Sequence, residues 1–286
     1  MKGDGEMNNR TMTVKEATND YFKRKAKKYD LVEEQAYWQL SDKILWTNFK
    51  RVLDKLPKNF EFIDAGGGTG RWSLKVLQEY PNAKGITYDL SHEMLTEAEE
   101  KRDKHELSDR WEIIQGDIHN VQDVQENRLD IAFNFHNVLG FVEYPIRVIK
   151  QLYKLLKPGG HLVSFVPNQY HSIYFNLANN RVNEARTATS GKGRFTQDMP
   201  YINVFTPQSI KEIYSVVGLE DMELLGFPAF IYPGYQETQL EGNTFELVDL
   251  LKDPSAFEEV FNIEMEFMDE QLAARGNNLY IVGLKK

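Results

Sequence analysis

Short apolar segments alternate with amphipathic ones through the middle of the chain, and this alternation restricts the fold more than any other feature of the sequence. Helical patterns cover residues 71–80, residues 91–104 and the stretch from residue 145 to Pro158-Gly159-Gly160. The segments between and around them read as strands, namely 60–64, 84–89, 111–117, 129–135 and 161–167. Strands joined by helices form a parallel sheet covered on both faces, because each connection crosses over in the right-handed sense. We therefore expect a doubly wound α/β sheet.

The rest of the chain extends this sheet and adds to it. Residues 206–227 predict a further helix and a sixth strand, and residues 277–286 predict a seventh strand. Residues 43–53 carry apolar side chains at helical spacing. The expected organisation is an N-terminal helical arm and lid (1–57), a ligand-binding core (58–167), a lid insertion (168–205), and the end of the core sheet (206–286) with an insertion at about 228–276.

Composition excludes several classes of function. The 286 residues include no cysteine, which excludes disulfides, thiolate zinc sites and cysteine nucleophiles. Histidines and carboxylates do not show metal-ligand spacing, so we predict no metal. No apolar stretch approaches the ~20 residues of a membrane span and the N-terminus lacks an apolar leader, so we expect a cytoplasmic protein without a membrane partner. The net charge of −9 argues against broad non-specific binding of polyanions.

The stretch FIDAGGGTGRWS (62–73) contains an acid, Asp64, and then four glycines within six residues. In a doubly wound sheet this turn lies at the carboxyl end of a strand and leads into a helix, where ligands of such sheets bind. A dinucleotide fingerprint needs another glycine at 71 or 73, and these positions hold Arg71 and Ser73. The lysine of a phosphate-binding loop is also missing. The loop therefore indicates a ligand that approaches the backbone closely without a phosphate-gripping lysine.

The pattern acid-x-Gly-x-Gly-x-Gly resembles the first motif of class I S-adenosylmethionine-dependent methyltransferases. Asp89 and Asp117 end the second and third expected strands, in register with later motifs of that family. LKPGGHLVSF (156–165) resembles the family's post-motif. The resemblance is specific over 60–167. It implies a Rossmann-like sheet of seven mostly parallel strands with an antiparallel last strand, covered by a lid of helices and loops.

The resemblance also implies S-adenosylmethionine as the cofactor, S-adenosylhomocysteine as the product, and most of the cofactor site. Asp89 is expected to accept hydrogen bonds from two ribose hydroxyls. Asp117 is expected to receive the adenine amino group, with the backbone amide and apolar side chain of Ile118 beside it. The expected cofactor residues are Asp64, Ala65, Gly66, Gly67, Gly68, Gly70, Asp89, Leu90, Asp117, Ile118, Phe135 and Tyr29.

Residues just after the fourth strand and in the first insertion are candidates for the acceptor side of the site. His136 lies where relatives face both cofactor and acceptor, so it is a candidate general base and substrate-binding residue. Asn137, Tyr170 and His171 are further candidates for substrate binding. Aromatic residues in the insertions predict either a pocket for a planar or amphipathic molecule or the lid's own core. The basic segment 181–194 predicts a mobile loop able to hold a carboxylate or phosphate.

Three functions agree with these residues. The sequence favours methyl transfer to an oxygen or nitrogen atom of a small-molecule metabolite, with no indication of the oligomeric state. A second interpretation is a tRNA methyltransferase, because the motif order is similar to bacterial enzymes that esterify carboxymethoxyuridine at the wobble position. Ser41 departs from that pattern, since a basic residue is expected there to help hold the carboxylate. The third is a non-catalytic cofactor-binding subunit, which the three intact strand-end acids argue against. We also expect segments 14–40 and 168–205 to close over the site.

Overall fold

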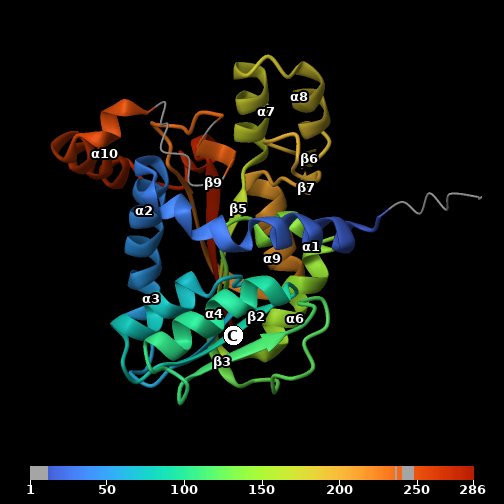
Figure 1. The fold of residues 1–286 in the computed structure, drawn as a ribbon, viewed down its shortest axis with the longest axis vertical. Helices are drawn as coiled ribbons and strands as arrows, with labels where there is room; N and C mark the ends of the chain where they lie inside the picture. Colours follow the sequence, from blue (N-terminus) through green and yellow to red (C-terminus); the bar gives the residue numbers. More distant parts are fainter. Residues whose placement is uncertain (1–11, 236, 240–247) are drawn as a thin grey trace, which may run out of the picture.

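A seven-stranded sheet forms the centre of the molecule, in the order β3-β2-β1-β4-β5-β9-β8 (Figure 1). The computed structural model describes residues 12–235, 237–239 and 248–286. The strands are β1 (Glu61–Ala65), β2 (Lys84–Asp89), β3 (Trp111–Gln115), β4 (Leu129–Asn134), β5 (Leu156–Pro167), β8 (Leu219–Phe227) and β9 (Asn278–Lys285). The first five pair in parallel, and β9 runs antiparallel to both β5 and β8. The expected doubly wound sheet with an antiparallel last strand is confirmed.

Helices cover both faces of this sheet, and each face has its own apolar core. Neighbouring residues of β1 illustrate this arrangement, since Phe62 packs on one face and Ile63 on the other. The first core includes side chains of α2 (Ala36–Leu53), α3 (Arg71–Glu79) and α4 (His92–Lys104). The second includes side chains of α6 (Pro145–Leu155) and α9 (Pro207–Val217). The helices expected at 43–53, 71–80, 91–104 and within 206–227 are therefore present.

Two boundaries differ from the sequence-based expectation. The helix α6 ends at Leu155, and Pro158-Gly159-Gly160 lies in the first half of β5 rather than at the helix end. A residue that precedes proline disfavours the helical region, so Lys157 cannot continue the helix. Strand β3 ends at Gln115, which leaves Asp117 in the turn that follows it.

Three elaborations surround the carboxyl ends of the strands. The N-terminal elaboration contains α1 (Val14–Lys25), the 3-10 helix η1 (Ala26–Glu34) and α2, and in Figure 1 its blue ribbon crosses between the sheet and the α7–α8 unit. The second contains α7 (Gln169–Ala178), α8 (Val182–Ala188), β6 (Lys192–Gly193) and β7 (Ile202–Asn203). The third follows β8 and contains η2 (Glu237–Gln239), η3 (Asp249–Lys252), α10 (Pro254–Glu266) and η4 (Ala273–Arg275). Residues 1–11 of the expected arm, and 236 and 240–247 of the expected insertion, lie outside the described residues.

The basic segment 181–194 is not a loop, so that expectation is wrong. Most of it forms α8 and β6. The Arg194 guanidinium pairs with Glu184, with 2.6 Å between Nη2 and Oε1. Arg181 donates to a backbone carbonyl and Lys192 to an amide oxygen of the same insertion. These three cations find acceptors within their own elaboration, because the α7–α8 unit folds back on itself.

Candidate active site

The glycine loop turns the chain from β1 into α3. Different physical reasons favour glycine at its different positions. Gly66, Gly68 and Gly70 all have positive φ, at 76°, 53° and 70°. A Cβ added at Gly66 would lie 2.6 Å from Val138, and one at Gly70 would lie 2.5 Å from Trp111. At Gly68 the added atom would meet only the terminal methyl of a methionine side chain. Packing within the protein therefore explains Gly66 and Gly70, whereas Gly68 keeps open the space in front of the loop.

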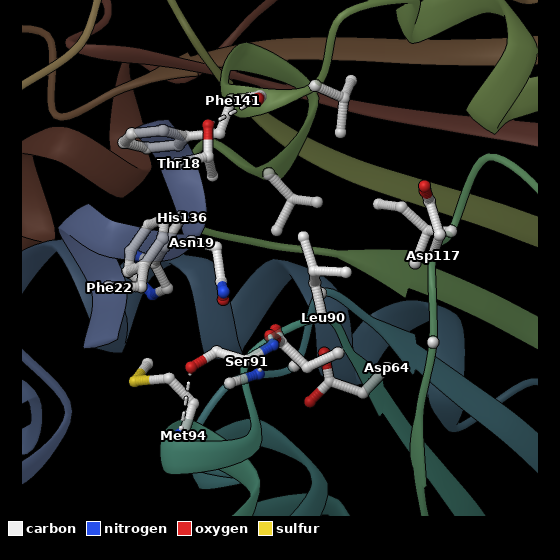
Figure 2. A pocket seen from close by; sticks show the side chains of 18 of the residues that line it. Thr18, Asn19, Phe22, Asp64, Leu90, Ser91, Met94, Asp117, His136 and Phe141 are labelled. Atoms are coloured by element: carbon white, nitrogen blue, oxygen red, sulfur yellow. Dashed lines mark hydrogen bonds between the residues drawn. The ribbon is translucent and has the colours of Figure 1, made fainter. Parts of the chain in front are cut away.

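A cavity of about 300 Å³ lies in that space, beyond the carboxyl ends of the parallel strands (Figure 2). Ala65 and Gly70 are the expected cofactor residues that do not line it, because Ala65 is buried within the sheet and Gly70 faces Trp111. The expected cofactor residues in its wall are Tyr29, Asp64, Gly66, Gly67, Gly68, Asp89, Leu90, Asp117, Ile118 and Phe135. The fold thus brings these residues together around one space.

Two of the strand-end acids are held by hydrogen bonds around the loop. Asp89 accepts from the backbone amides of Gly68 and Ser91, each at 2.9 Å, and burial raises its pKa. Asp64 accepts from the Ser73 hydroxyl at 2.9 Å. Burial raises the pKa of Asp64 to about 7, and the nearby charge of Asp89 contributes. Asp64 is only 2% exposed, so its carboxyl supports the loop from beneath.

Asp117 already has partners within the protein. Its Oδ2 accepts from the Lys15 ammonium at 2.8 Å, and its Oδ1 accepts from the backbone amide of His119 at 3.0 Å. Burial alone would raise the pKa of Asp117, but the hydrogen bonds from Lys15 and His119 lower it to about 2. A ligand amino group that approaches Asp117 therefore competes with Lys15.

The N-terminal elaboration forms part of the cavity wall, and Tyr29 is the one residue of it that the sequence assigned to the cofactor. Lys15, Thr18, Asn19 and Phe22 of α1 all line the cavity. The Thr18 hydroxyl donates to the carbonyl of Phe141 at 3.1 Å, and the rings of Phe22 and Phe141 lie 4.8 Å apart. Helix α1 therefore covers the cavity in this structure. Its movement on cofactor binding stays a prediction.

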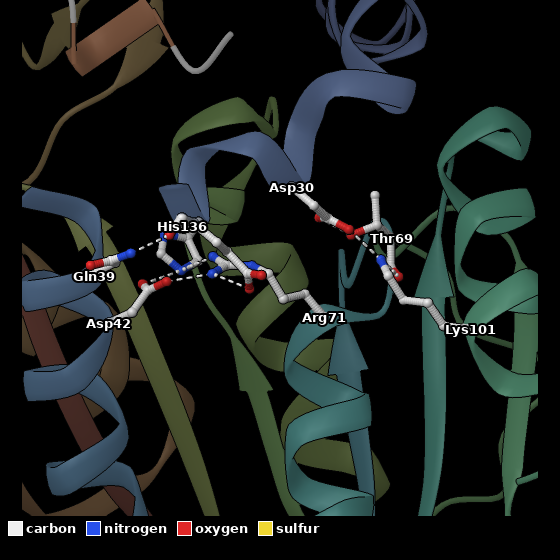
Figure 3. A network of polar contacts seen from close by, with 8 residues as sticks. Asp30, Gln39, Asp42, Thr69, Arg71, Lys101 and His136 are labelled. Carbon is white, nitrogen blue, oxygen red and sulfur yellow. Dashed lines mark hydrogen bonds and ion pairs between the residues drawn. The ribbon is translucent and has the colours of Figure 1, made fainter. Parts of the chain in front are cut away.

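The 3-10 helix η1 is joined to the glycine loop by a group of polar contacts (Figure 3). The Thr69 hydroxyl donates to Asp30 Oδ1 at 2.7 Å. The Lys101 ammonium pairs with Asp30 and donates to the Thr69 carbonyl at 2.8 Å. These contacts also position Tyr29, whose pKa burial raises to about 12. The arm and the loop therefore form one connected wall.

A second polar network joins α2, α3 and the end of β4 (Figure 3). Arg71 pairs with Asp42 and also with Glu33, and its Nη2 lies 3.0 Å from His136 Nε2. Asp42 Oδ1 lies 3.2 Å from the same nitrogen. Burial alone would raise the pKa of Asp42, but Arg71 and His136 hold it well below its usual range. Sequence reasoning missed Asp42 and treated Arg71 only as an absent glycine, although Arg71 directly follows the loop.

A second cavity, of about 60 Å³, adjoins the first. Tyr29, Arg71 and His136 line both, as do two phenylalanines. His136 and Asn137 have positive φ, at 51° and 72°, in the turn after β4. Of the candidate acceptor residues, His136, Asn137 and His171 line the second cavity. Tyr170 lines neither cavity, because it is 49% exposed on the outer side of α7.

Fold and site together define a Rossmann-like domain with a nucleoside-type cofactor pocket, because acids and a glycine loop meet at the carboxyl ends of parallel strands. A family model described as a methyltransferase domain matches residues 62–160, the stretch that contains those elements. Residues 62–160 therefore form a class I S-adenosylmethionine-dependent methyltransferase domain, whose cofactor is S-adenosylmethionine. The open space in front of Gly68 and the acceptor oxygens of Asp89 fit that cofactor.

Relatives agree with this family and differ in their substrates. The chain is 31% identical over 140 residues to tRNA 5-carboxymethoxyuridine methyltransferase of Escherichia coli (strain K12). The matched residues cover 49% of this chain and 52% of the relative. It is 26% identical over 186 residues to demethylmenaquinone methyltransferase of Chlamydia trachomatis. That match covers 62% of this chain and 73% of the relative. The chain therefore spans about half the length of the first relative.

A solved structure supports the fold. Haemonchus contortus phosphoethanolamine N-methyltransferase 2 in complex with S-adenosyl-L-methionine superposes with a TM-score of 0.63 at 16% identity. The match covers 96% of this chain and 60% of that one.

Within residues 12–235, 237–239 and 248–286, no helix combines the length and the apolar character that crossing a membrane requires. In those same ranges, histidines and carboxylates form no cluster of three or more that is arranged to bind a metal ion.

Proposed function

We propose that this protein transfers a methyl group from S-adenosylmethionine to an oxygen or nitrogen atom of a small-molecule metabolite. The observation that supports this most is the second cavity, which shares His136 and Arg71 with the cofactor cavity. Its volume of about 60 Å³ is that of roughly four to five water molecules, each of which needs about 10–15 Å³, so a single ring of an acceptor fits inside. All three elaborations contribute to its wall, and its aromatic members are Tyr21, Phe22, Tyr29, Trp38, Phe141 and Phe195.

The protein's part in such a reaction is to hold the acceptor and to accept its proton. S-adenosylmethionine supplies a methyl group on a positively charged sulfur, already activated for transfer to a lone pair. The Phe22 and Phe141 rings, which line both cavities, exclude water from the junction between them. Acceptors that lose a proton need a base within hydrogen-bond reach of that proton.

His136 is the proposed general base, and Asp42 is the proposed positioning residue. Nε2 of His136 either accepts a hydrogen bond from Arg71 or donates one to Asp42, and the two arrangements exclude each other. When Nε2 donates to Asp42, Nδ1 keeps a free lone pair that can take the acceptor's proton. Because Asp42 stays charged, it also stabilises the imidazolium that results.

The tRNA methyltransferase is the second candidate, and the 31% identity to the Escherichia coli enzyme favours it. A carboxymethoxyuridine carries a carboxylate, which a cation should hold. Ser41 is fully buried on α2, so the position where a basic residue is expected faces the core. Arg71, which lines both cavities, is already paired with Asp42 and Glu33. These two observations rank tRNA below a small acceptor.

Labelled cofactor distinguishes the candidates. The protein is incubated with S-adenosylmethionine labelled at the methyl group and with either bulk tRNA or small metabolites from the source cell. We expect label in the small-metabolite fraction, and mass spectrometry of the product identifies the methylated atom. Label in tRNA would reverse the ranking. Tight cofactor binding without label in either fraction would support a non-catalytic subunit.

Variants test the proposed roles. His136→Ala should lower kcat by roughly 100-fold or more, since general-base catalysis contributes about 10²–10⁴. Asp42→Asn should lower kcat by a smaller factor and leave the KM for S-adenosylmethionine unchanged. His105→Ala is the matched control, because His105 is an exposed histidine just after α4. Unchanged turnover in His136→Ala would show that His136 is not the base.

A further inference from the structure

We propose that His171 is an uncharged hydrogen-bonding group in the wall of the second cavity that selects acceptors with a planar ring and an uncharged polar substituent. This inference rests on the proposed function of that cavity as the acceptor site. It goes further by assigning the residue that recognises the acceptor and the chemical class that it recognises.

The observation behind it is a buried imidazole without partners. His171 lies on α7, is 4% exposed and lines the second cavity. Neither Nδ1 nor Nε2 has a hydrogen-bond partner among the described residues. A buried polar group left unpaired destabilises the folded protein, and such groups are rare in native proteins. A cavity beside such a group provides room for the missing partner.

The surroundings keep this imidazole neutral. Four rings lie around it, with centroid distances of 5.0 Å to Tyr232, 6.1 Å to Tyr174 and Phe175, and 6.2 Å to Phe195. Burial lowers the pKa of His171 to about 3, without a contribution from a charged neighbour. The neutral imidazole offers one N–H donor and one acceptor nitrogen.

The two histidines of the cavity therefore favour different chemical groups of a ligand, because their surroundings differ in charge. His136 lies beside the charged pair of Asp42 and Arg71, whereas His171 lies among aromatic rings. A carboxylate, phosphate or ammonium group next to His171 would be buried without a counter-charge, which is costly. A hydroxyl, carbonyl or amide group pairs with the imidazole at no such cost. Aromatic walls favour a planar ring, because rings stack or pack edge to face.

His171 is held in place from outside the cavity. Asn168 caps the start of α7 by accepting from the Tyr170 amide at 3.0 Å. Its side-chain amide also donates to the carbonyls of Ala274 and Gly276, at 2.9 and 2.7 Å. Helix α7 is thereby anchored to the third elaboration, and the imidazole cannot easily turn towards solvent to find a partner there.

Three probes of similar size and different charge test the inference. Phenol, benzoate and benzylamine are titrated into the full chain saturated with S-adenosylhomocysteine, by calorimetry and by NMR of ¹⁵N-labelled histidine. We expect phenol to bind at least tenfold more tightly than the other two and to shift the ¹⁵N signals of His171. Equal or tighter binding of benzoate or benzylamine, or no binding of phenol, would overturn the proposal.

Two substitutions locate the effect. His171→Phe should weaken phenol binding at least fivefold, whereas His171→Gln, which keeps a donor and an acceptor, should stay within about threefold of the unaltered chain. Tyr170→Phe is the control, because Tyr170 is the neighbouring residue on α7 and lies outside both cavities. Affinity for S-adenosylhomocysteine should be the same in all variants. Undiminished phenol binding by His171→Phe contradicts the inference.

The outcome is separate from that of the proposed function. If phenol binding depends on His171 but no cell fraction takes up labelled methyl, the proposed function fails and the binding inference stands. If a metabolite is methylated while phenol affinity is the same with and without the His171 imidazole, the inference alone fails.

Discussion

The cofactor cavity and the second cavity share a wall and are built in opposite ways. The glycines of the cofactor cavity and the acids Asp64, Asp89 and Asp117 come from one stretch, from β1 to the turn after β3, and lie at or just after the end of a strand. The second cavity combines all three elaborations, which long-range contacts hold together. The Trp38 indole donates to the carbonyl of Glu237 at 2.6 Å, and Asn277 donates to the Tyr37 hydroxyl at 2.8 Å. Cofactor recognition is therefore a local property of the sheet, and acceptor recognition depends on distant segments.

The largest expected effect comes from adding one methyl group to the glycine loop. Gly68→Ala should weaken S-adenosylmethionine binding about 10- to 100-fold, since overpacking costs about 1–3 kcal/mol. Gly191→Ala is the matched change on the acceptor side, because Gly191 has φ of 83° and an added Cβ would make only an ordinary contact, 3.9 Å from the carbonyl oxygen of Val204. It should lower the free energy of unfolding by about 1 kcal/mol without affecting cofactor affinity. Calorimetry and urea unfolding measure both. Equal affinities of the two variants for S-adenosylmethionine would contradict the assignment of cofactor recognition to the glycine loop.

The next effect is a pH dependence confined to the cofactor side. Asp64 has a pKa of about 7 in the folded protein, above its unfolded value, so the folded state binds more protons between about pH 4 and pH 7. The stability that Asp64 contributes is therefore lost as pH rises through that window. Asp64→Asn removes this loss. The free energy of unfolding of the variant minus that of the unaltered chain should therefore increase from pH 5 to pH 8, by on the order of 2 kcal/mol.

Asp117→Asn provides the control for this pH series. The pKa of Asp117 is lowered to about 2, so its titration lies below pH 5. The difference between this variant and the unaltered chain should stay constant from pH 5 to pH 8. Urea unfolding without cofactor measures all three proteins. A constant difference for Asp64→Asn as well would show that Asp64 is ionised throughout.

The smallest expected effect concerns the arm that covers the cofactor cavity. Lys15→Met keeps most of the side chain and removes the charge that competes for Asp117. Affinity for S-adenosylmethionine should rise about two- to threefold at low salt, because exposed ion pairs contribute about 0.2–1 kcal/mol. The gain should shrink at high salt, where the pair is screened. Weaker binding would show that Lys15 assists the cofactor rather than competing with it.

The sequence predicted the elements around the cofactor cavity better than the elaborations around the second cavity. The strands and the crossover helices were predicted correctly apart from the end of α6 and the end of β3 before Asp117, because a strand of alternating faces and a glycine turn are properties of five to ten neighbouring residues. The segment 181–194 was predicted wrongly as a mobile loop. Its cations look unpaired in sequence, and only the folding of α8 against the following strand pair brings Arg194 to Glu184.

By itself the sequence determined the sheet, the position of the cofactor loop and the family, since each follows from local patterns in register along the chain. Tertiary structure alone decided that Asp42 and Arg71 meet at His136, because those residues come from three separate elements. It also decided that Lys15 reaches Asp117 and that the buried His171 imidazole has no hydrogen-bond partner among the residues that the structure describes. The physical reason is that burial and pairing depend on which distant segments pack together, and residue spacing within one segment carries no record of that packing.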